Sequence, residues 1–327
     1  MYSLFHFPLT LTLALPAQAP APATIDQGRE LTSMFYKGAD AAVWARFSDR
    51  MKQALGKVES LSSLRSQVEE QAGSEQVVLD EKVDVVSGMQ VYLRTARFGK
   101  APGPVMVQWT LGSTGTVEGF FIRPAPKEAP TERLDYATKT PLELPFAGQW
   151  LVFWGGRTLA QNYHTMSVDQ RFAYDILIRR GASSHQGDGK RNGDYYCFGQ
   201  KLVAPAGGTV VSVENSIDDN VPGVMNPGQP MGNHVIIDHG NGEFSFFAHF
   251  LKGSVAVKKG DRLKGGDLLG LVGNSGNSSE PHLHYHLQDT GEFGKGRGLP
   301  AAFQDYFADG QAVKRGEPIK GQVIERR

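Results

Sequence analysis

Three histidines stand at alternate positions near the C-terminal end of the sequence, in GNSGNSSEPHLHYHLQD (residues 273–289). Successive side chains of a β-strand point to opposite faces, so a strand here would have a polar face and an apolar face. The polar face would carry His282, His284, His286 and Gln288, and the apolar face Leu283, Tyr285 and Leu287. One such histidine is usually an ordinary surface residue, but three together indicate metal binding or proton transfer.

Two further strand-like segments each carry one ionisable side chain among apolar ones. In QRFAYDILI (170–178), Phe172, Tyr174 and Ile176 alternate, which places Asp175 on the opposite face. In FSFFAHF (244–250), the same alternation turns His249 away from an aromatic face. Any one of these residues alone could simply form a structural hydrogen bond. Together they favour a metal site, because side chains from several strands of one sheet can converge on one ion.

The segments around these residues resemble the lysostaphin-type (LytM-like) zinc endopeptidases of bacterial cell walls. The likeness covers roughly residues 150–290 and is carried by APAGGTVVSV, GNHVIIDHGNGEFSFFAHF and VKKGDRLKGGDLLGLVGNSGNSSEPHLHYHL. The resemblance implies a compact antiparallel β core with a Zn²⁺ site at one end of a groove. It also implies hydrolysis of short peptide bridges or stems in peptidoglycan.

The resemblance implies a role for each of the residues that it matches. His284 and Asp175 would be zinc ligands, and His282 and His249 would be the catalytic imidazoles. A catalytic zinc keeps three protein ligands and an open position for water, whose pKa falls toward about 7. An imidazole can then take or give the proton. We expect His286 to orient a ligand.

The third ligand is the point at which this sequence departs from the family pattern. The family usually places a histidine four residues before the aspartate, and Arg171 occupies that position here. The alternatives are His164, at the entrance to the strand of Asp175, and His185, in a glycine-rich segment. We expect His164 to complete the zinc set with Asp175 and His284, and His185 to belong to a loop that lines the groove.

The sequence predicts two domains behind an export signal. Residues 1–23 are typical of a signal peptide, although without a basic start, and residues 24–124 predict a small α+β accessory domain. That domain would have helices followed by an antiparallel meander, weakly similar to cystatin-like folds, and it contains no histidine. Residues 125–145 predict a linker. Residues 146–327 predict an all-β antiparallel peptidase domain, because strand-like runs alternate with glycine-rich turns.

The composition limits which binding partners and which cellular compartment we expect. The 34 basic and 34 acidic side chains balance, which argues against a broad nucleic-acid-binding surface. Beyond the signal we find no apolar run long enough to span a membrane, so we expect an exported protein, periplasmic or extracellular, without stable membrane insertion. Cys197 is the only cysteine, so no intramolecular disulfide can form. The oligomeric state is not indicated.

We therefore expect a secreted zinc metalloendopeptidase that hydrolyses peptidoglycan stem or cross-bridge peptides. The main alternative is a non-catalytic relative that binds wall peptides or regulates a wall hydrolase, a reading that Arg171 favours. A lipoyl- or biotin-carrier module is suggested by VAVKKGDRLKGGDLLGLV, but the methionine–lysine pair typical of the modified hairpin is missing. Two other histidines, His234 and His239, are expected to be structural.

Overall fold

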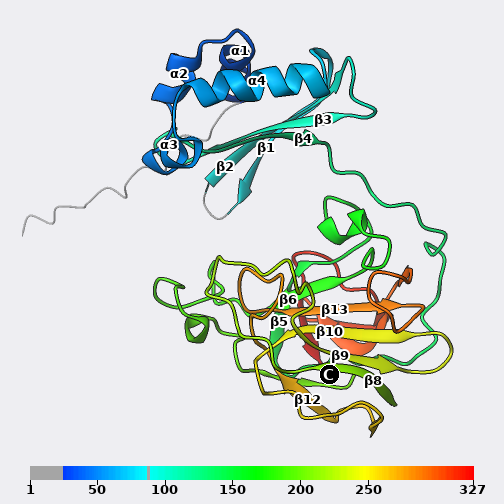
Figure 1. The fold of residues 1–327 in the computed structure, drawn as a ribbon. Helices are drawn as coiled ribbons and strands as arrows, with labels where there is room; N and C mark the ends of the chain where they lie inside the picture. Colours follow the sequence, from blue (N-terminus) through cyan, green and yellow to red (C-terminus); the bar gives the residue numbers. More distant parts are fainter. Residues whose placement is uncertain (1–24, 87–88) are drawn as a thin grey trace, which may run out of the picture. The chain divides into compact units, whose positions relative to one another are not determined.

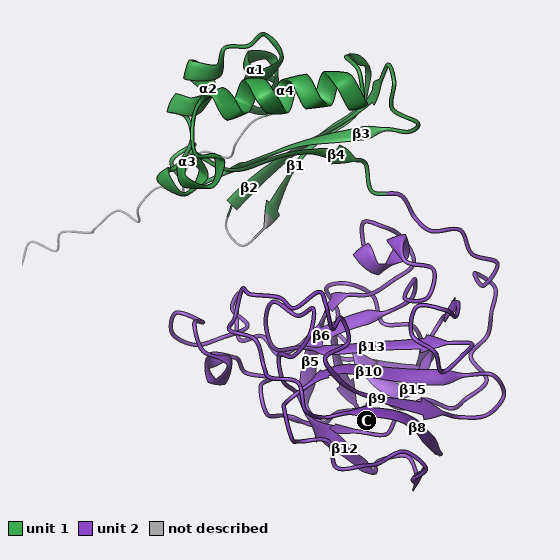
Figure 2. Cartoon of the chain, in the orientation of Figure 1, with its two compact units in different colours: residues 1–126 green, residues 127–327 purple. Residues whose placement is uncertain are grey.

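The computed structural model describes residues 25–86 and 89–327 of the 327-residue chain. The chain divides into two compact units, residues 1–126 and 127–327 (Figure 2). The predicted signal peptide, residues 1–23, lies outside the described residues. Among the described residues, no helix has the length and apolar character needed to cross a bilayer.

The first unit has helices on one side of an antiparallel sheet (Figure 1). The helices are α1 (Ile25–Tyr36), α2 (Asp40–Ala45), α3 (Asp49–Leu55) and α4 (Glu59–Gln71), and the strands are β1 (Glu75–Val86), β2 (Met89–Phe98), β3 (Val105–Leu111) and β4 (Val117–Pro124). The strands pair in chain order. The predicted order of helices followed by an antiparallel meander is thus confirmed, while the cystatin-like comparison stays a prediction.

Alternating apolar residues explain how this unit holds together. Leu31 and Phe35 of α1 are buried against Tyr92, Trp109 and Phe120, which lie on the helix-facing side of the sheet. The indole of Trp109 stacks on Phe120 with ring centroids 3.8 Å apart. Strand β1 was missed by the sequence analysis, because its charged residues hide the alternation. It is an edge strand, for which charged side chains are usual.

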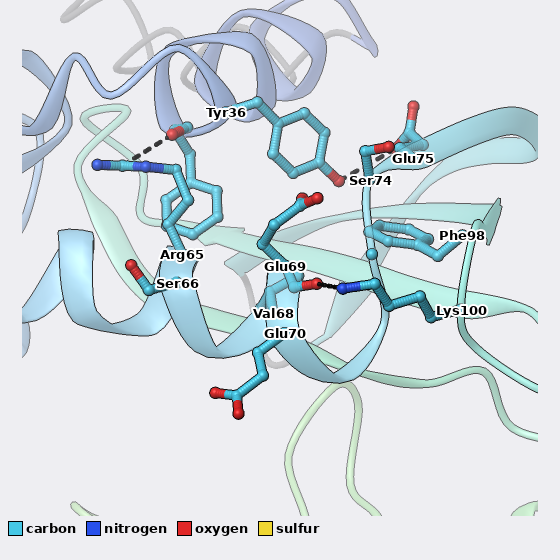
Figure 3. Close-up of a pocket in the computed structure, with 12 residues that line it drawn as sticks. Tyr36, Arg65, Ser66, Val68, Glu69, Glu70, Ser74, Glu75, Phe98 and Lys100 are labelled. Atoms are coloured by element: carbon cyan, nitrogen blue, oxygen red, sulfur yellow. Dashed lines mark hydrogen bonds between the residues drawn. The ribbon is translucent and has the colours of Figure 1, made fainter.

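A pocket of about 700 Å³ lies between the C-terminal end of α1, helix α4, and the place where β1 begins and β2 ends (Figure 3). Phe35, Val68 and Phe98 supply apolar walls. At the rim, the hydroxyl of Tyr36 donates to Glu75, and the ammonium of Lys100 donates to the backbone carbonyl of Glu69. These polar groups are bonded within the protein, so the pocket indicates no particular ligand.

The second unit is built from strands and two 3-10 helices. The strands are β5 (Gln149–Trp154), β6 (Tyr174–Leu177), β7 (Lys201–Val203), β8 (Gly208–Glu214), β9 (Asn233–Asp238), β10 (Phe244–Phe250), β11 (Arg262–Leu263), β12 (Leu268–Leu271), β13 (Leu283–Gln288), β14 (Gly298–Leu299), β15 (Phe303–Ala308), β16 (Gln311–Gly316) and β17 (Val323–Arg326). The 3-10 helices are η1 (Tyr163–Met166) and η2 (Asn192–Asp194). The β-rich character predicted for this part of the chain is confirmed.

The main sheet brings distant parts of the sequence side by side. Its order is β11-β8-β9-β10-β13-β6-β5-β17-β15-β16, with β14 paired to β13. Strand β13 lies in the middle, and every one of its residues is buried. Tyr285 and Leu287 on its apolar face join the core of the unit with Phe247 and Phe303. The predicted apolar face is therefore real, but the opposite, polar face is also covered.

The segment predicted as a linker, residues 125–145, packs for the most part against the second unit. Leu142 and Leu144 are buried in its core. The buried carboxylate of Glu243 accepts hydrogen bonds from the Lys139 and Thr140 amides, at 2.6 and 2.8 Å. We expected a solvated spacer because prolines, threonines and charges dominate this stretch. Its few apolar residues and its backbone donors nevertheless find buried partners.

Candidate metal centre

Three neighbouring strands bring the candidate site residues onto one face of the sheet. In the antiparallel pairs, His284 of β13 stands opposite Asp175 of β6 on one side and opposite Ala248 of β10 on the other. Residues directly opposite one another project to the same face. The small side chain of Ala248 leaves room there for the imidazole and the carboxylate.

Asp175, His284 and His164 form a compact group. The Oδ1 atom of Asp175 lies 2.9 Å from Nδ1 of His284 and 3.6 Å from Nε2 of His164. One ligand-type atom from each of the three residues falls within 4.8 Å of the others, and all three residues are buried. This spacing suits a single ion held by two imidazoles and one carboxylate.

The 3-10 helix η1 carries His164 to this point, and Arg171 braces it. The guanidinium of Arg171 donates 3.0 Å to the Thr165 carbonyl in η1, and it also donates to the Ala129 carbonyl and to Glu128. Arg171 is buried, and it fastens η1 to the chain that enters the unit. The residue in the position where the family usually has a ligand thus supports the neighbouring segment instead.

His249 reaches the site through an unusual backbone conformation. Its φ is +66°, in the left-handed region that non-glycine residues rarely adopt. Simple alternation would place it on the core side with Phe247, because Phe246 and Ala248 stand opposite His286 and His284. The simple alternation from which we predicted that His249 turns away from an aromatic face therefore does not hold here. An irregularity between Phe247 and Phe250 turns the His249 ring back toward His284, with centroids 5.7 Å apart.

The rings of His249 and His282 each present Nε2 to the centre of the site. Nδ1 of His249 lies 2.7 Å from the Ser275 carbonyl, and Nδ1 of His282 lies 2.8 Å from the Glu280 carbonyl. A carbonyl only accepts, so both Nδ1 atoms carry a proton, and Nε2 is bare whenever the ring is neutral. Nε2 of His282 lies 3.4 Å from Oδ1 of Asp175. Both imidazoles thus direct Nε2 toward the site.

Residues 194–294 match the model of Peptidase family M23. This segment forms an M23 peptidase domain. It includes His249, His282 and His284, and it begins downstream of His164 and Asp175.

Two proteins with related sequences are named as endopeptidases, and the name of one of them includes peptidoglycan. "Peptidoglycan DD-endopeptidase ShyA" of Vibrio cholerae is 38% identical over 92 residues, which are 27% of this chain and 21% of that protein. "DD-carboxypeptidase/endopeptidase Mpg" of Neisseria meningitidis is 41% identical over 61 residues, 19% of this chain and 14% of its own. The chain thus spans about a fifth or less of the length of these two curated relatives. The solved catalytic domain of lysostaphin from Staphylococcus simulans aligns over 46% of this chain and 86% of its own, at 20% identity and a TM-score of 0.28.

The candidate centre holds His164 and Asp175 in the charge states that a metal requires. Burial lowers the pKa of His164 to about 3. Burial alone would raise the pKa of Asp175, but His164 and His282 outweigh it and hold that pKa well below its usual value. Metal ligands must be neutral imidazoles and ionised carboxylates. Near neutral pH these two side chains meet that condition.

Two neighbouring pockets form a groove beside the candidate centre. One pocket, of about 70 Å³, contains Tyr163, His249, Asn277 and His284 in its walls. A second, of about 310 Å³, also has Tyr163 and Asn277 in its walls and extends over Trp154, Glu280 and His282. The shared residues make the two pockets neighbours.

The chemistry of the donor set fits a zinc ion. Nε2 of His164 is buried and has no hydrogen-bond partner among residues 25–86 and 89–327, although it points toward Asp175. A buried polar nitrogen without a partner costs free energy on the order of 1–3 kcal/mol. A cation shared with Asp175 and His284 would satisfy it. Two imidazoles and a carboxylate are ligands that Zn²⁺ commonly takes.

The other predicted histidines lie elsewhere or behind the ligands. His185 is half-buried in a loop, its ring against Tyr195, and is not among the grouped ligand atoms. Both nitrogens of His239 are hydrogen-bonded, to the Gly207 carbonyl and to Ser245, and those of His234 are bonded in the same way, to backbone and to a serine. His286 is buried behind His284. These positions agree with structural roles for His234 and His239.

Two residues that touch the site, Asn162 and Tyr163, were not predicted from the sequence, and Gln288 was placed on the polar face of its strand without a role. Tyr163 stacks near His164 and its hydroxyl lies 3.4 Å from Asp175. Asn162 and Gln288 bond to the histidines. Gln288 follows the same period-two alternation as the histidines, so the sequence indicated its position on their face of the strand. Nothing in the pattern around Asn162 and Tyr163 singles them out, because a 3-10 helix has too few residues to show a period.

Proposed function

We propose that this protein is a zinc endopeptidase that hydrolyses peptide bonds in peptidoglycan stem or cross-bridge peptides. The observation that carries the proposal is the convergence of His164, Asp175 and His284 on one point, where Nε2 of His164 has no hydrogen-bond partner in the described part of the chain. The match to Peptidase family M23 and the name of the Vibrio cholerae relative support the substrate class.

His164, Asp175 and His284 would hold the ion. When bound, Zn²⁺ supplies a Lewis acid that polarises a peptide carbonyl and lowers the pKa of a water molecule. Arg171 acts through η1, because its bonds keep the segment of His164 in place. We assign no ligand role to His185.

His249 and His282 are the proposed acid–base groups. Each directs Nε2 to the site and holds its Nδ1 proton on a backbone carbonyl. Proton transfer to and from the leaving amine can therefore pass through Nε2. Burial would lower the pKa of His282, but the charge of Asp175 raises it overall, whereas burial holds the pKa of His249 well below its usual value. His282 is thus the ring that more readily takes up a proton and passes it on, whereas His249 stays neutral.

The groove supports a peptide substrate. Tyr163 is 42% exposed beside the site, and Trp154 lies edge-on to it with centroids 5.4 Å apart. Such aromatic surfaces can pack against an extended backbone. We further propose export to the periplasm or the exterior, which the substrate class requires, and a non-catalytic accessory role for the first unit.

The second candidate function is a non-catalytic wall-peptide binder or a regulator of a wall hydrolase. Arg171 in place of the usual ligand was the sequence feature that favoured it. Because His164 offers the missing nitrogen, that feature no longer weighs against a complete set of three ligands.

Digestion of purified sacculi tests the proposal. We expect the zinc-loaded protein to release muropeptides that mass spectrometry identifies as products of peptide-bond cleavage, and a chelator to abolish the release. Added Zn²⁺ should restore it. A protein that binds zinc but releases no fragment from sacculi of either cross-link type would support the binding function instead.

A further inference from the structure

The orientation of the Asn162 side chain is fixed by its surroundings. Its amide nitrogen lies 3.1 Å from the Gly156 carbonyl and 2.8 Å from the Ala173 carbonyl. Carbonyls only accept, so both amide protons are used there and the amide oxygen must face the other way. That oxygen lies 2.9 Å from Nδ1 of His164. Nδ1 of His164 must therefore carry the proton, which leaves its Nε2 bare.

Gln288 repeats this arrangement on β13. Its amide nitrogen donates to the carbonyls of Thr290 and Glu292, at 2.7 and 2.9 Å. Its oxygen then faces Nε2 of His286 at 3.3 Å. His286 must donate from Nε2. A neutral His286 ring therefore has a bare Nδ1.

The tautomer of His286 determines which nitrogen of His284 carries the proton. Nδ1 of His286 lies 3.1 Å from Nε2 of His284, so His284 must donate from Nε2 and its Nδ1 is bare. That Nδ1 faces Oδ1 of Asp175 at 2.9 Å. His286 is 1% exposed and stacks on Phe246, with ring centroids 4.4 Å apart, so a second proton on its ring would place a charge in an apolar site.

We propose that Asn162 and the His286–Gln288 pair are positioning residues that lock opposite ring tautomers in the two histidine ligands. His164 is locked with Nδ1–H and binds through Nε2, while His284 is locked with Nε2–H and binds through Nδ1. The inference rests on the proposed zinc site and adds how the site selects its donor atoms.

The two locks act on the same point. With both tautomers fixed, two nitrogen lone pairs and the Asp175 carboxylate face one another, and they repel unless a cation stands between them. A free imidazole would have to exchange its proton between nitrogens before binding. The lone pairs that would bind the ion are therefore already in place before it arrives. Replacement of a residue that orients a metal ligand typically changes metal affinity 10- to 100-fold.

Nuclear magnetic resonance of the full chain tests the tautomers directly. In long-range ¹H–¹⁵N spectra of the zinc-loaded protein with ¹⁵N-labelled histidine, we expect a proton on Nδ1 of His164 and on Nε2 of both His284 and His286. The opposite tautomer in His164 or in His284 would overturn the inference, whatever the affinity for zinc.

Zinc affinity, measured by competition with a chromophoric chelator, tests His286. His286→Leu removes the acceptor behind His284, and we expect the Kd for Zn²⁺ to rise 10- to 100-fold. His286→Gln can accept from His284 and donate to Gln288, so it should restore most of the affinity. His239→Leu is the matched control, because it removes a histidine with two structural bonds away from the ligands and should leave the Kd unchanged.

The outcomes separate this inference from the proposed function. If the unmodified chain binds no zinc, the proposed function fails. If it binds zinc and His286→Leu binds equally well, or if His286→Gln is as weak as His286→Leu, the zinc site stands and the lock through His286 is refuted.

Discussion

Replacement of Glu243 by glutamine is expected to loosen the second unit. The Glu243 side chain is buried and accepts from the Tyr136 hydroxyl at 2.8 Å, from the Lys139 and Thr140 amides, and from the Thr140 hydroxyl. A glutamine has one oxygen, so its NH₂ group must face one of the two backbone amides. That amide cannot turn, whereas the hydroxyls can.

The size of the effect follows from these bonds. One buried amide left without an acceptor costs about 1–3 kcal/mol, and loss of the charge weakens the remaining bonds by about 1 kcal/mol in total. We therefore expect Glu243→Gln to lower the free energy of unfolding of this unit by about 2–4 kcal/mol. Since 1.4 kcal/mol is a factor of ten, amides that exchange through unfolding should exchange roughly 30- to 1,000-fold faster.

Hydrogen exchange read by mass spectrometry measures this change. Peptides from residues 136–144 and from β13 should both lose protection if the whole unit is destabilised. Glu143→Gln is the matched control, because Glu143 pairs with Arg326 at a partly exposed position and should change exchange little. Unchanged protection in both peptides of Glu243→Gln would refute the assigned role of the carboxylate.

The same carboxylate predicts how stability depends on pH. Burial would raise the pKa of Glu243, but the bonds from Lys139 and Thr140 outweigh it, so the folded pKa is lowered. Because the folded pKa lies below the unfolded value, this stabilisation is complete above the ordinary glutamate pKa of about 4.3. It is lost as the pH falls through the folded pKa. In acid, the difference between the native chain and Glu243→Gln should therefore shrink.

Three further predictions concern the site and the units. His164→Ala should lose stoichiometric zinc by elemental analysis, whereas His185→Ala should keep it; the reverse would assign the ligand to the loop. His249→Ala and His282→Ala should each retain zinc and lose on the order of 100- to 10,000-fold in turnover on sacculi, and a variant with full turnover would remove its residue from the mechanism. The fragment 127–327 should fold and bind zinc by itself; an insoluble or metal-free fragment would show that the first unit is needed.

Strand periodicity made much of the site predictable. Because β13 and β6 are regular, the shared face of His284 and His286 and the inward direction of Asp175 could be deduced from sequence alone. The burial of both faces of β13 could not be deduced in this way, because alternation shows which residues are apolar but not what covers the polar ones.

Two features required the structure, for physical reasons. His249 lies beyond an irregularity with a positive φ, and period-two alternation fails at such a point. The placement of His164 depends on η1 and on bonds from Arg171 to residues about 40 positions upstream. Long-range contacts of this kind leave no local pattern. The packing of residues 125–145 could not be predicted, because a few buried residues, such as Leu142, outweigh a polar composition.

The backbone at His249 has a consequence for the stability of the unit. A non-glycine residue in the left-handed region costs roughly 1–2 kcal/mol, and asparagine or glycine would relieve part of that cost. Either replacement would also remove the hydrogen bond between Nδ1 and the Ser275 carbonyl, together with the imidazole that the proposed proton transfer needs. Backbone strain and the proposed chemistry therefore make opposing demands on this one residue.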